Sequence, residues 1–245
     1  MKLISHLKNG TILHLERSGS LTISVAENTH YRWLSFGDVI QSIMHKRKPA
    51  SLTLPHQILL CLPLLWMHSP KVIEFGLGGG NFTRFMSARY GVNTVTSIEY
   101  DERVISLFHQ YFNPLLAITD IKAEEANHYI GSNSLAQFDW IIIDIYPSKG
   151  VLEKILKKMY KMPSSLKALS INLPNYSDNE IEQLLKRLSP FKDKFEVRYF
   201  NVPKYSNIII HITTKENLIN APFNPNFPPF QNTRWLSYWQ QGNIL

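Results

Sequence analysis

A short apolar run that leads into a glycine-rich turn constrains the fold of this chain more than any other feature. Residues 71–85 read KVIEFGLGGGNFTRF, with Gly76, Gly78 and Gly80 directly after the apolar residues and a helical pattern after the glycines. Glycine lets the backbone come close to a ligand, and the N-terminus of the next helix favours polar or anionic groups. The segment predicts a strand, a ligand-binding turn and a helix.

Strands and helices are expected to alternate from residue 55 to residue 215. The strand-like runs are KVIEF, TVTSIEY, FDWIIIDIY and ALSINL, and the segments between them have helical spacing. This alternation is typical of an α/β protein with a Rossmann-like doubly wound sheet. The last two runs, FEVRYFNV and SNIIIHIT, are close together and predict an antiparallel hairpin at the sheet edge.

The chain is expected to have three parts. Residues 1–54 hold β-rich runs separated by turn residues, and they predict a small N-terminal β domain. Residues 55–215 predict the Rossmann-like nucleoside-binding catalytic domain. Residues 216–245 are rich in proline and aromatic residues, which indicates an ordered tail that packs through its rings on the body or on a partner subunit.

Composition excludes several classes of protein. Hydrophobic residues make up 44% of the 245 residues and charged residues 18%, so the chain can bury a core and is not disordered. Cys61 is the single cysteine, which excludes an internal disulfide and a cysteine-based metal site, and we expect no metal. No apolar stretch is long enough to span a bilayer, so we expect a soluble, cytoplasmic protein without a membrane partner.

The formal net charge of +7 could indicate an anionic partner or only a solvated surface. The lysines at 154, 157, 158 and 161 share a predicted helix with an apolar stripe, so they are expected to lie on its outer face. No aromatic residues interleave with them as a base-stacking surface would require. A nucleic-acid partner is therefore not expected.

An acidic residue after the glycine turn indicates a nucleoside ligand. Glu99 ends the next predicted strand, where a carboxylate accepts hydrogen bonds from ribose hydroxyls. Asn81 stands where a dinucleotide-binding G-x-G-x-x-G turn has its last glycine. The series beginning at Glu74 instead fits E-x-G-x-G-x-G, which resembles the first motif of S-adenosylmethionine-dependent methyltransferases. Glu124 and Glu125 precede a predicted helix and are candidates for contacts with an adenine edge, or are plain solvated residues.

Asp144 is the candidate catalytic residue. It follows the apolar run at the carboxyl edge of the predicted sheet, where ligands bind in this architecture. A carboxylate there can orient an amine or act as its general base. A helix-capping or ion-paired aspartate is the alternative interpretation.

Several motifs together resemble the spermidine synthase family, the polyamine aminopropyltransferases, over about residues 20–215. LSFGDVIQS is similar to L-x-L-D-G-x-x-Q, PHQILLCLPLL to Y-[HQ]-E-M-x-x-x-x-P-L, and KVIEFGLGGG to K-V-L-x-x-G-G-G-D-G. FDWIIIDIYP is similar to F-D-V-I-x-x-D-x-x-D-P, and VPKYSN to P-x-Y-x-x-G.

The resemblance implies roles for individual residues. It implies Asp144 as the catalytic aspartate. It implies a co-substrate site, for decarboxylated S-adenosylmethionine or S-adenosylmethionine, at Gln41, Gly76, Gly78, Gly80, Glu99 and Glu125. It implies substrate-binding roles for His56, Tyr146 and Tyr205. It also implies a homodimer and a small-molecule amine as the acceptor.

The departures from the family pattern concern the amine side of the site. Gly79 replaces the aspartate that contacts the amino end of the transferred group, the second aspartate after Asp144 is absent, and Pro55 replaces a tyrosine. Each lost charge-assisted contact would cost roughly 1.5 to 3 kcal/mol, so two losses predict about a hundredfold weaker diamine binding. Gly79 is also expected to leave room for the carboxylate of intact S-adenosylmethionine.

Four functions remain open at this point. The first is a spermidine synthase-like transferase with an atypical polyamine pocket. The second is a small-molecule methyltransferase on the same fold, and the third is a nucleoside-binding homologue without turnover. The fourth is an RNA-modifying enzyme, which only the positive charge supports.

Overall fold

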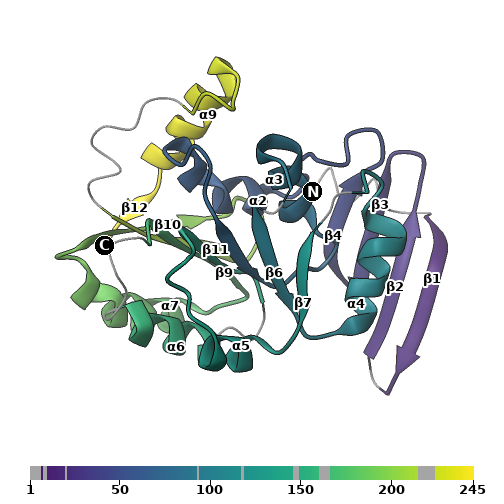
Figure 1. Ribbon diagram of the computed structural model, residues 1–245, viewed down its shortest axis with the longest axis horizontal. Coiled ribbons are helices and arrows are strands. Elements are labelled where there is room, and N and C mark those ends of the chain that lie inside the picture. The colour runs from purple at the N-terminus through teal and green to yellow at the C-terminus, as the bar shows by residue number, and fades with distance from the viewer. Residues whose placement is uncertain are drawn as a thin grey trace. The chain divides into compact units, whose positions relative to one another are not determined.

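The computed structural model describes residues 7, 10–19, 21–92, 94–116, 119–145, 149–159, 166–214 and 224–245 (Figure 1). Contacts along the backbone divide the chain into two compact units. Unit 1 is Met1–Leu54 with Gly76–Glu125, and unit 2 is Pro55–Phe75 with Ala126–Leu245. This division runs through the predicted Rossmann-like domain. The predicted domain boundaries after residues 54 and 215 stay a prediction.

Unit 1 begins with a four-stranded antiparallel sheet, in purple and blue in Figure 1. Its strands, in spatial as well as chain order, are β1 (Thr11–Ser18), β2 (Leu21–Glu27), β3 (Tyr31–Phe36) and β4 (Val39–His45). Short turns join each strand to the next, as the alternation of β-rich runs and turn residues predicted. The prediction of a small N-terminal sheet is confirmed.

The remainder of unit 1 carries the predicted turn and its neighbours. Helix α3 (Asn81–Tyr90) follows the glycines, and β6 (Val95–Glu99) pairs in parallel with β7 (Asp120–Ala123). Between them the expected helix is present in two forms, α4 (Glu102–Leu107) and then the π-helical turn η2 (Phe108–Phe112).

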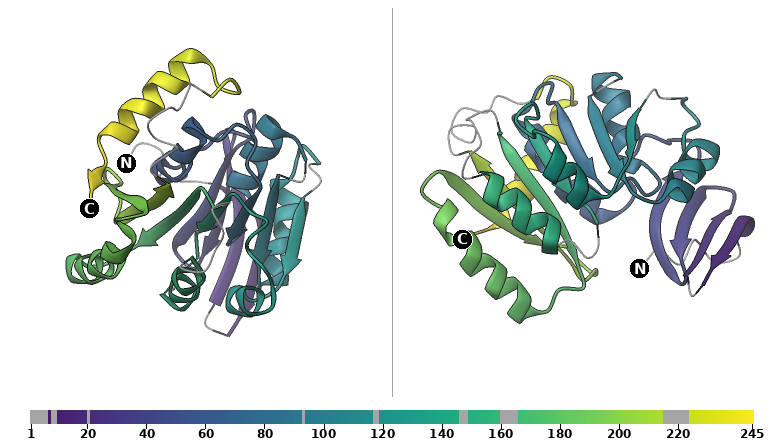
Figure 2. Two further views of the ribbon diagram at one scale, coloured as in Figure 1. Left: turned by 60° about the vertical axis from the view of Figure 1, so that its left-hand side comes forward. Right: turned by 60° about the horizontal axis from the view of Figure 1, so that its bottom comes forward.

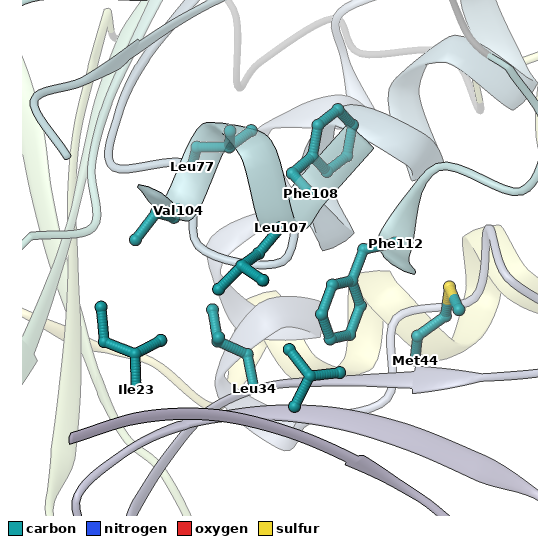
Figure 3. Close-up of a cluster of buried hydrophobic side chains, with 9 residues drawn as sticks. Ile23, Leu34, Met44, Leu77, Val104, Leu107, Phe108 and Phe112 are labelled. Atoms are coloured by element: carbon teal, nitrogen blue, oxygen red, sulfur yellow. The ribbon is translucent and has the colours of Figure 1, made fainter. Parts of the chain in front are cut away.

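An apolar cluster joins the N-terminal sheet to α4 and η2 within unit 1 (Figure 3). Side chains from β2, β3 and β4 meet side chains from the glycine turn, α4 and η2. Its nine buried members are Ile23, Val25, Leu34, Met44, Leu77, Val104, Leu107, Phe108 and Phe112. Burial of this much apolar surface fixes the sheet against the segment that carries the turn.

The strands of unit 2 combine parallel and antiparallel pairing. In spatial order they run β12-β10-β11-β9-β8-β5. The pairs of β5 with β8 and of β8 with β9 are parallel, and the pairs that involve β10, β11 and β12 are antiparallel. Their bounds are β5 Val72–Phe75, β8 Trp140–Ile143, β9 Ala168–Pro174, β10 Phe195–Asn201, β11 Asn207–Thr214 and β12 Asn243–Ile244. The predicted hairpin is confirmed, but the edge belongs to β12.

Helices lie on both sides of the strands of unit 2. In both Figure 1 and Figure 2, α5, α6 and α7 lie along one side and α9 lies on the other. Their bounds are α2 Pro55–Leu60, η1 Leu62–Leu65, α5 Ala126–Ser132, α6 Lys149–Met159, α7 Asp178–Leu188, η3 Ser189–Phe191 and α9 Pro229–Gln240. The α/β architecture predicted from the alternation is therefore present.

Local sequence explains where two helices of unit 2 begin and end. Helix α2 gives way to the 3₁₀ turn η1 after Leu60, since Pro63 has no N–H to donate. Helix α7 begins with a capping box, in which Ser177 and Glu180 each bond the other's backbone N–H.

The described part of the aromatic tail, residues 224–245, packs on unit 2 itself. The Trp239 ring lies 4.7 Å from the Trp66 ring, 5.7 Å from Phe200 and 5.5 Å from His211, measured between centroids. The Arg198 guanidinium lies 4.9 Å from the centre of the Trp239 ring. Of the two surfaces expected to receive the tail, the chain's own body is the one observed.

Lysines of α6 are part of the structure of unit 2. Lys154 donates to the carbonyl of Asn127 at 3.2 Å, and Lys158 donates to the carbonyls of Ile130 and Asn133. Ile130 and Asn133 lie at the C-terminal end of α5, where a cation suits the last carbonyls of a helix. No helix in the described part of the chain has both the length and the apolar character needed to cross a bilayer.

Candidate functional site

The glycine turn of unit 1 begins immediately after β5 and ends where α3 begins. Its backbone is left-handed at three positions, with φ of 101° at Gly76, 51° at Gly78 and 65° at Gly80. Residues with a Cβ rarely adopt such angles, so glycine lets the turn form without strain. The three glycines predicted to bind the co-substrate are the ones that shape the turn.

Glu99 is tied to this turn through both carboxylate oxygens. Oε2 accepts the Leu77 N–H at 3.2 Å, and Oε1 accepts the Asp101 N–H at 3.1 Å. Burial raises the pKa of Glu99, and hydrogen bonds from backbone amides act in the opposite direction. The Gly78 N–H donates to this carboxylate as well, which leaves one lone pair to accept a hydroxyl donor.

The backbone amides of the turn are already engaged with acceptors inside unit 1. The donor–acceptor pairs are Gly76 to the Ile98 carbonyl (2.9 Å), Leu77 and Gly78 to the Glu99 carboxylate, Gly79 to Ser42 Oγ (2.8 Å) and Gly80 to the Leu77 carbonyl (2.8 Å). A turn that cradles a phosphate presents its amides to the ligand. This turn therefore fits a ligand recognised through hydroxyls better than a pyrophosphate.

The other two residues predicted for the nucleoside, Gln41 and Glu125, also lie in unit 1. Gln41 is exposed on β4, and its neighbour Ser42 is the residue that contacts the turn. Glu125 is exposed directly after Glu124, whose N–H donates to the Glu99 carbonyl at 3.0 Å. Ligand contacts of Gln41 and Glu125 stay predictions. The contact of Ser42 depends on strand packing, and no local sequence pattern indicated it.

The expectation that Gly79 leaves open space needs correction. A Cβ built on Gly79 would lie 2.7 Å from the Cβ of Ser42 and 3.3 Å from the ring of Phe112. The direction that a side chain at position 79 would take is therefore filled by the protein, so Gly79 does not by itself make room for a carboxylate there.

In unit 2, Asp144 directly follows β8 and is held by backbone and side chain. Its N–H donates to the carbonyl of Phe75 at 2.9 Å, and Phe75 is the residue before the glycine turn. Its Oδ1 accepts a hydrogen bond from Nδ2 of Asn172 at 2.7 Å. No hydrogen bond to Oδ2 is found from any described residue.

Asn172 belongs to the site although the sequence analysis did not select it. It lies on β9 beside β8 and is buried, and its own Oδ1 accepts from Nδ2 of Asn207 at 2.9 Å. Two amides in series thus fix the orientation of Asn172 and, through it, of Asp144. The available signal was an amide in the run ALSINL, whose other polar residue is Ser170.

His56 lies at the first turn of α2, and its Nδ1 is enclosed without a hydrogen-bond partner among the described residues. Burial lowers the pKa of His56, and the charge of Asp144 acts in the opposite direction. The imidazole is therefore neutral at pH 7. Burial also raises the pKa of the Cys61 thiol, as do the carboxylates of Glu74 and Asp144. These residues form one cluster at the carboxyl end of β5 and β8.

The two predicted substrate-side tyrosines are not brought to Asp144 by any described contact. Tyr205 is half-buried in the turn between β10 and β11, where its N–H donates to the Val202 carbonyl. Tyr146 lies outside the described residues. Their roles in substrate binding stay predictions. Within the described residues, no three His, Cys, Asp or Glu side chains gather as a metal site.

The fold resembles solved transferase structures. A probable spermidine synthase from Corynebacterium glutamicum aligns with a TM-score of 0.64 and 17% identity, over 83% of this chain and 80% of that one. A spermidine synthase in complex with the transition-state analogue AdoDATO aligns at 0.58 and 17%, over 90% and 78%. Human methyltransferase-like protein 13 in complex with SAH aligns at 0.55 and 15%, over 76% and 92%. The Rossmann-like fold of the methyltransferase type is confirmed.

Sequence relatives identify the family. A polyamine aminopropyltransferase from Chromobacterium violaceum is 29% identical over 92 residues, which are 37% of this chain and 35% of the relative. The match thus spans about a third of the length of the curated relative. The model of the spermine/spermidine synthase domain matches residues 55–225, more than half of the chain. This chain therefore belongs to the spermine/spermidine synthase family.

Proposed function

We propose that this chain is a spermidine synthase-like transferase that moves an aminopropyl group from decarboxylated S-adenosylmethionine to an amine acceptor. The observation that carries the proposal is the carboxylate of Asp144. It ends a buried strand, is oriented by Asn172, and bonds through its backbone to the residue before the glycine turn. Family membership and the spermidine synthases of similar fold support the same reaction class.

The co-substrate is proposed to lie on unit 1, with its ribose hydroxyls on Glu99. The engaged amides of the turn favour a nucleoside sulfonium over a dinucleotide. Neighbours of the same fold are described with SAH or AdoDATO, which supports a ligand of this chemical class. A sulfonium supplies a carbon that is open to attack by an amine.

Asp144 is proposed as the general base and as the group that orients the amine. The nitrogen lone pair of the acceptor attacks the carbon next to sulfur, so a C–N bond forms and the C–S bond breaks. The electron pair of the broken bond returns to sulfur, and methylthioadenosine leaves. Oδ2 of Asp144 takes the proton released by nitrogen and passes it to solvent. Orientation of the amine by a fixed carboxylate supplies much of the acceleration.

The acceptor pocket is proposed to be atypical. His56 is neutral and enclosed beside Asp144, so it can accept a hydrogen bond from an ammonium group but adds no negative charge. The family's second aspartate is absent from the sequence. Asp144 is then the carboxylate left for the amine, which favours an acceptor with few positive charges.

Methyl transfer from intact S-adenosylmethionine is the second candidate. The E-x-G-x-G-x-G series from Glu74 and the fold shared with methyltransferase-like protein 13 favour it. A non-catalytic nucleoside-binding protein is the remaining alternative. Family resemblance also leads us to propose a cytoplasmic homodimer without a nucleic-acid or membrane partner, and sedimentation analysis measures its oligomeric state.

A thermal-shift panel tests the ligand. Methylthioadenosine, S-adenosylmethionine and its decarboxylated form are each added at about a hundred times the expected dissociation constant. A bound ligand adds about 2.7 kcal/mol, or roughly 5 to 10 °C for a chain of this size. We expect the largest shift with the decarboxylated form. A larger shift with the intact form favours methylation, and no shift with any of the three contradicts a nucleoside site.

Asp144→Asn tests the catalytic role. The variant keeps the shape of the side chain but loses its charge and its basicity, so transfer should fall by roughly 10² to 10⁴-fold. The thermal shift with methylthioadenosine should stay within about 1 °C of the wild-type shift, because Asp144 is proposed to face the amine. Transfer at the wild-type rate would remove Asp144 from the mechanism.

A further inference from the structure

The glycine turn is held from one side by a residue of the N-terminal sheet. Oγ of Ser42 on β4 accepts the N–H of Gly79 at 2.8 Å, and both residues are buried. The contact joins residues 37 positions apart in the sequence. Strand β4 is thus part of the wall that sets the backbone of the turn.

The same contact leaves no space for a side chain at position 79. An added Cβ would lie 2.7 Å from Cβ of Ser42, closer than real Cβ contacts, and 3.3 Å from the Phe112 ring. Phe112 is fully buried in the apolar cluster of unit 1, as Figure 3 shows, so its ring can give way only by the few tenths of an ångström that this contact requires. As long as residue 42 carries a side chain, only glycine fits at position 79.

The opposite side of Gly79 is held as firmly. Arg84 is fully buried and donates to the Gly79 carbonyl, to the Phe112 carbonyl at 2.9 Å and to the Pro49 carbonyl at 2.8 Å. Asn81 connects the start of α3 to β4 by donating to the Ile43 carbonyl at 2.8 Å. Both the N–H and the carbonyl of Gly79 are thus engaged by side chains of unit 1, and the turn is preorganised.

We propose that Ser42 is a positioning residue for the nucleoside-binding turn, and that residues 42 and 79 act as a coupled pair. Ser42 occupies the place that a side chain at position 79 would take. Its Oγ also accepts the N–H of Gly79. At this point the co-substrate then contacts a fixed backbone and not a carboxylate. This inference rests on the proposed nucleoside-binding function.

The coupling of residues 42 and 79 predicts the effect of substitutions at both positions. Introducing an aspartate by Gly79→Asp alone does not create a contact with the donor's amino end, because Ser42 and Phe112 fill its path. Shortening residue 42 to glycine is required first. Ser42→Ala does not suffice, since alanine keeps the Cβ that lies 2.7 Å from the added atom.

The test compares six chains: wild type, Ser42→Gly, Ser42→Ala, Gly79→Ala, and the two doubles that join Gly79→Ala to each change at 42. The dissociation constant of methylthioadenosine is measured by calorimetry and the urea midpoint without ligand. Gly79→Ala should weaken binding at least tenfold. The double with Ser42→Gly should bind within about threefold of Ser42→Gly alone, and the double with Ser42→Ala should remain weak. Gly131→Ala is the control, since nothing lies within 4 Å of its added Cβ.

The outcomes separate the pair from the function. If the effects at 42 and 79 add without rescue in both measurements, the pair is not coupled and the inference is overturned. Rescue of the urea midpoint without rescue of binding also overturns it, since Ser42 then has only a structural role. If the wild type binds no nucleoside, the proposed function fails, and with it the positioning role, while the urea midpoints still decide whether the pair is coupled.

Discussion

At the scale of single residues, the candidate site depends on how polar side chains are held. Asp144 presents Oδ2 because Asn172 occupies Oδ1 and Asn207 in turn holds Asn172. Buried polar groups are costly unless each is paired, so this series of hydrogen-bonded side chains has one favoured arrangement. The orientation of the proposed base is therefore set by residues that need not touch the substrate.

Asn172→Leu tests this orientation. Leucine has a similar volume but cannot donate to Asp144, and it leaves Nδ2 of Asn207 without its acceptor. We expect kcat to fall about tenfold or more while KM for the co-substrate stays within twofold, because the carboxylate loses its orientation. The free energy of unfolding should fall by about 1 to 3 kcal/mol.

The matched control for that variant is Asn207→Ala, which removes the outer link and leaves the bond between Asn172 and Asp144 in place. Its effect on kcat should be smaller than that of Asn172→Leu. Steady-state kinetics with varied co-substrate measure both parameters. An unchanged kcat for Asn172→Leu would show that Asp144 does not need this amide.

At the scale of elements, a buried histidine joins strand β11 to helix α2. Nε2 of His211 donates to the Leu59 carbonyl at 3.0 Å, so Nδ1 must accept from the hydroxyl of Ser170 at 2.7 Å. Ser170 Oγ in turn accepts the indole N–H of Trp140 at 2.8 Å. This series of hydrogen bonds holds α2, and with it His56, against the strands that carry Asp144 and Asn172.

The buried histidine predicts how stability depends on pH. Burial lowers the pKa of His211, the hydrogen bond to the Leu59 carbonyl opposes this, and the charge of Arg198 adds to it, so that the pKa is about 3. In the unfolded chain a histidine titrates near 6.5. As pH falls from about 6.5 toward about 3, the unfolded state binds a proton at this histidine and the folded state does not. The contribution of His211 to stability is therefore fully present above this window and is lost within it.

His211→Asn measures this contribution, because asparagine does not titrate. Between pH 6.5 and 5 the wild type should lose up to about 1.4 kcal/mol more per pH unit than the variant, measured as urea unfolding at each pH. Parallel pH profiles of the two proteins would mean that His211 is not the group responsible. The variant should be less stable at pH 7, since it cannot reproduce both hydrogen bonds.

Helix α9 makes a separate prediction for stability. The Trp239 side chain is 6% exposed and contacts rings from three other elements, whereas Phe230 on the same helix is 73% exposed. Trp239→Ala should lower the free energy of unfolding by about 3 to 5 kcal/mol. Phe230→Ala should change it by about 0.5 kcal/mol or less. Equal effects in urea unfolding would show that the tail does not pack as described.

At the scale of the whole molecule, the sequence predicted what depends on local pattern. The strand–helix alternation, the glycine turn and the position of Asp144 at a strand end each follow from residues close together in the chain. Ser42 and Asn172 were missed for one reason: their contacts reach 37 and 28 residues along the sequence and depend on strand packing and register. The same limit explains why Gly79 was taken as open space.

Each of the two units holds its candidate residues by a hydrogen-bond network of its own. In unit 1, Glu99 and Ser42 occupy the amides of the turn. In unit 2, Asn172 occupies one oxygen of Asp144. The tail also belongs to unit 2, and its helix α9 lies beyond the residues that match the family domain.

Product analysis by mass spectrometry tests the central claim most directly. The full chain is incubated with decarboxylated S-adenosylmethionine and a series of mono-, di- and polyamines, and separately with intact S-adenosylmethionine. We predict equal amounts of methylthioadenosine and an aminopropylated amine from the decarboxylated donor, and about a hundredfold less of both, or lower still, with Asp144→Asn. A methylated amine from the intact donor, or no product from any amine although the donor binds, would contradict aminopropyl transfer.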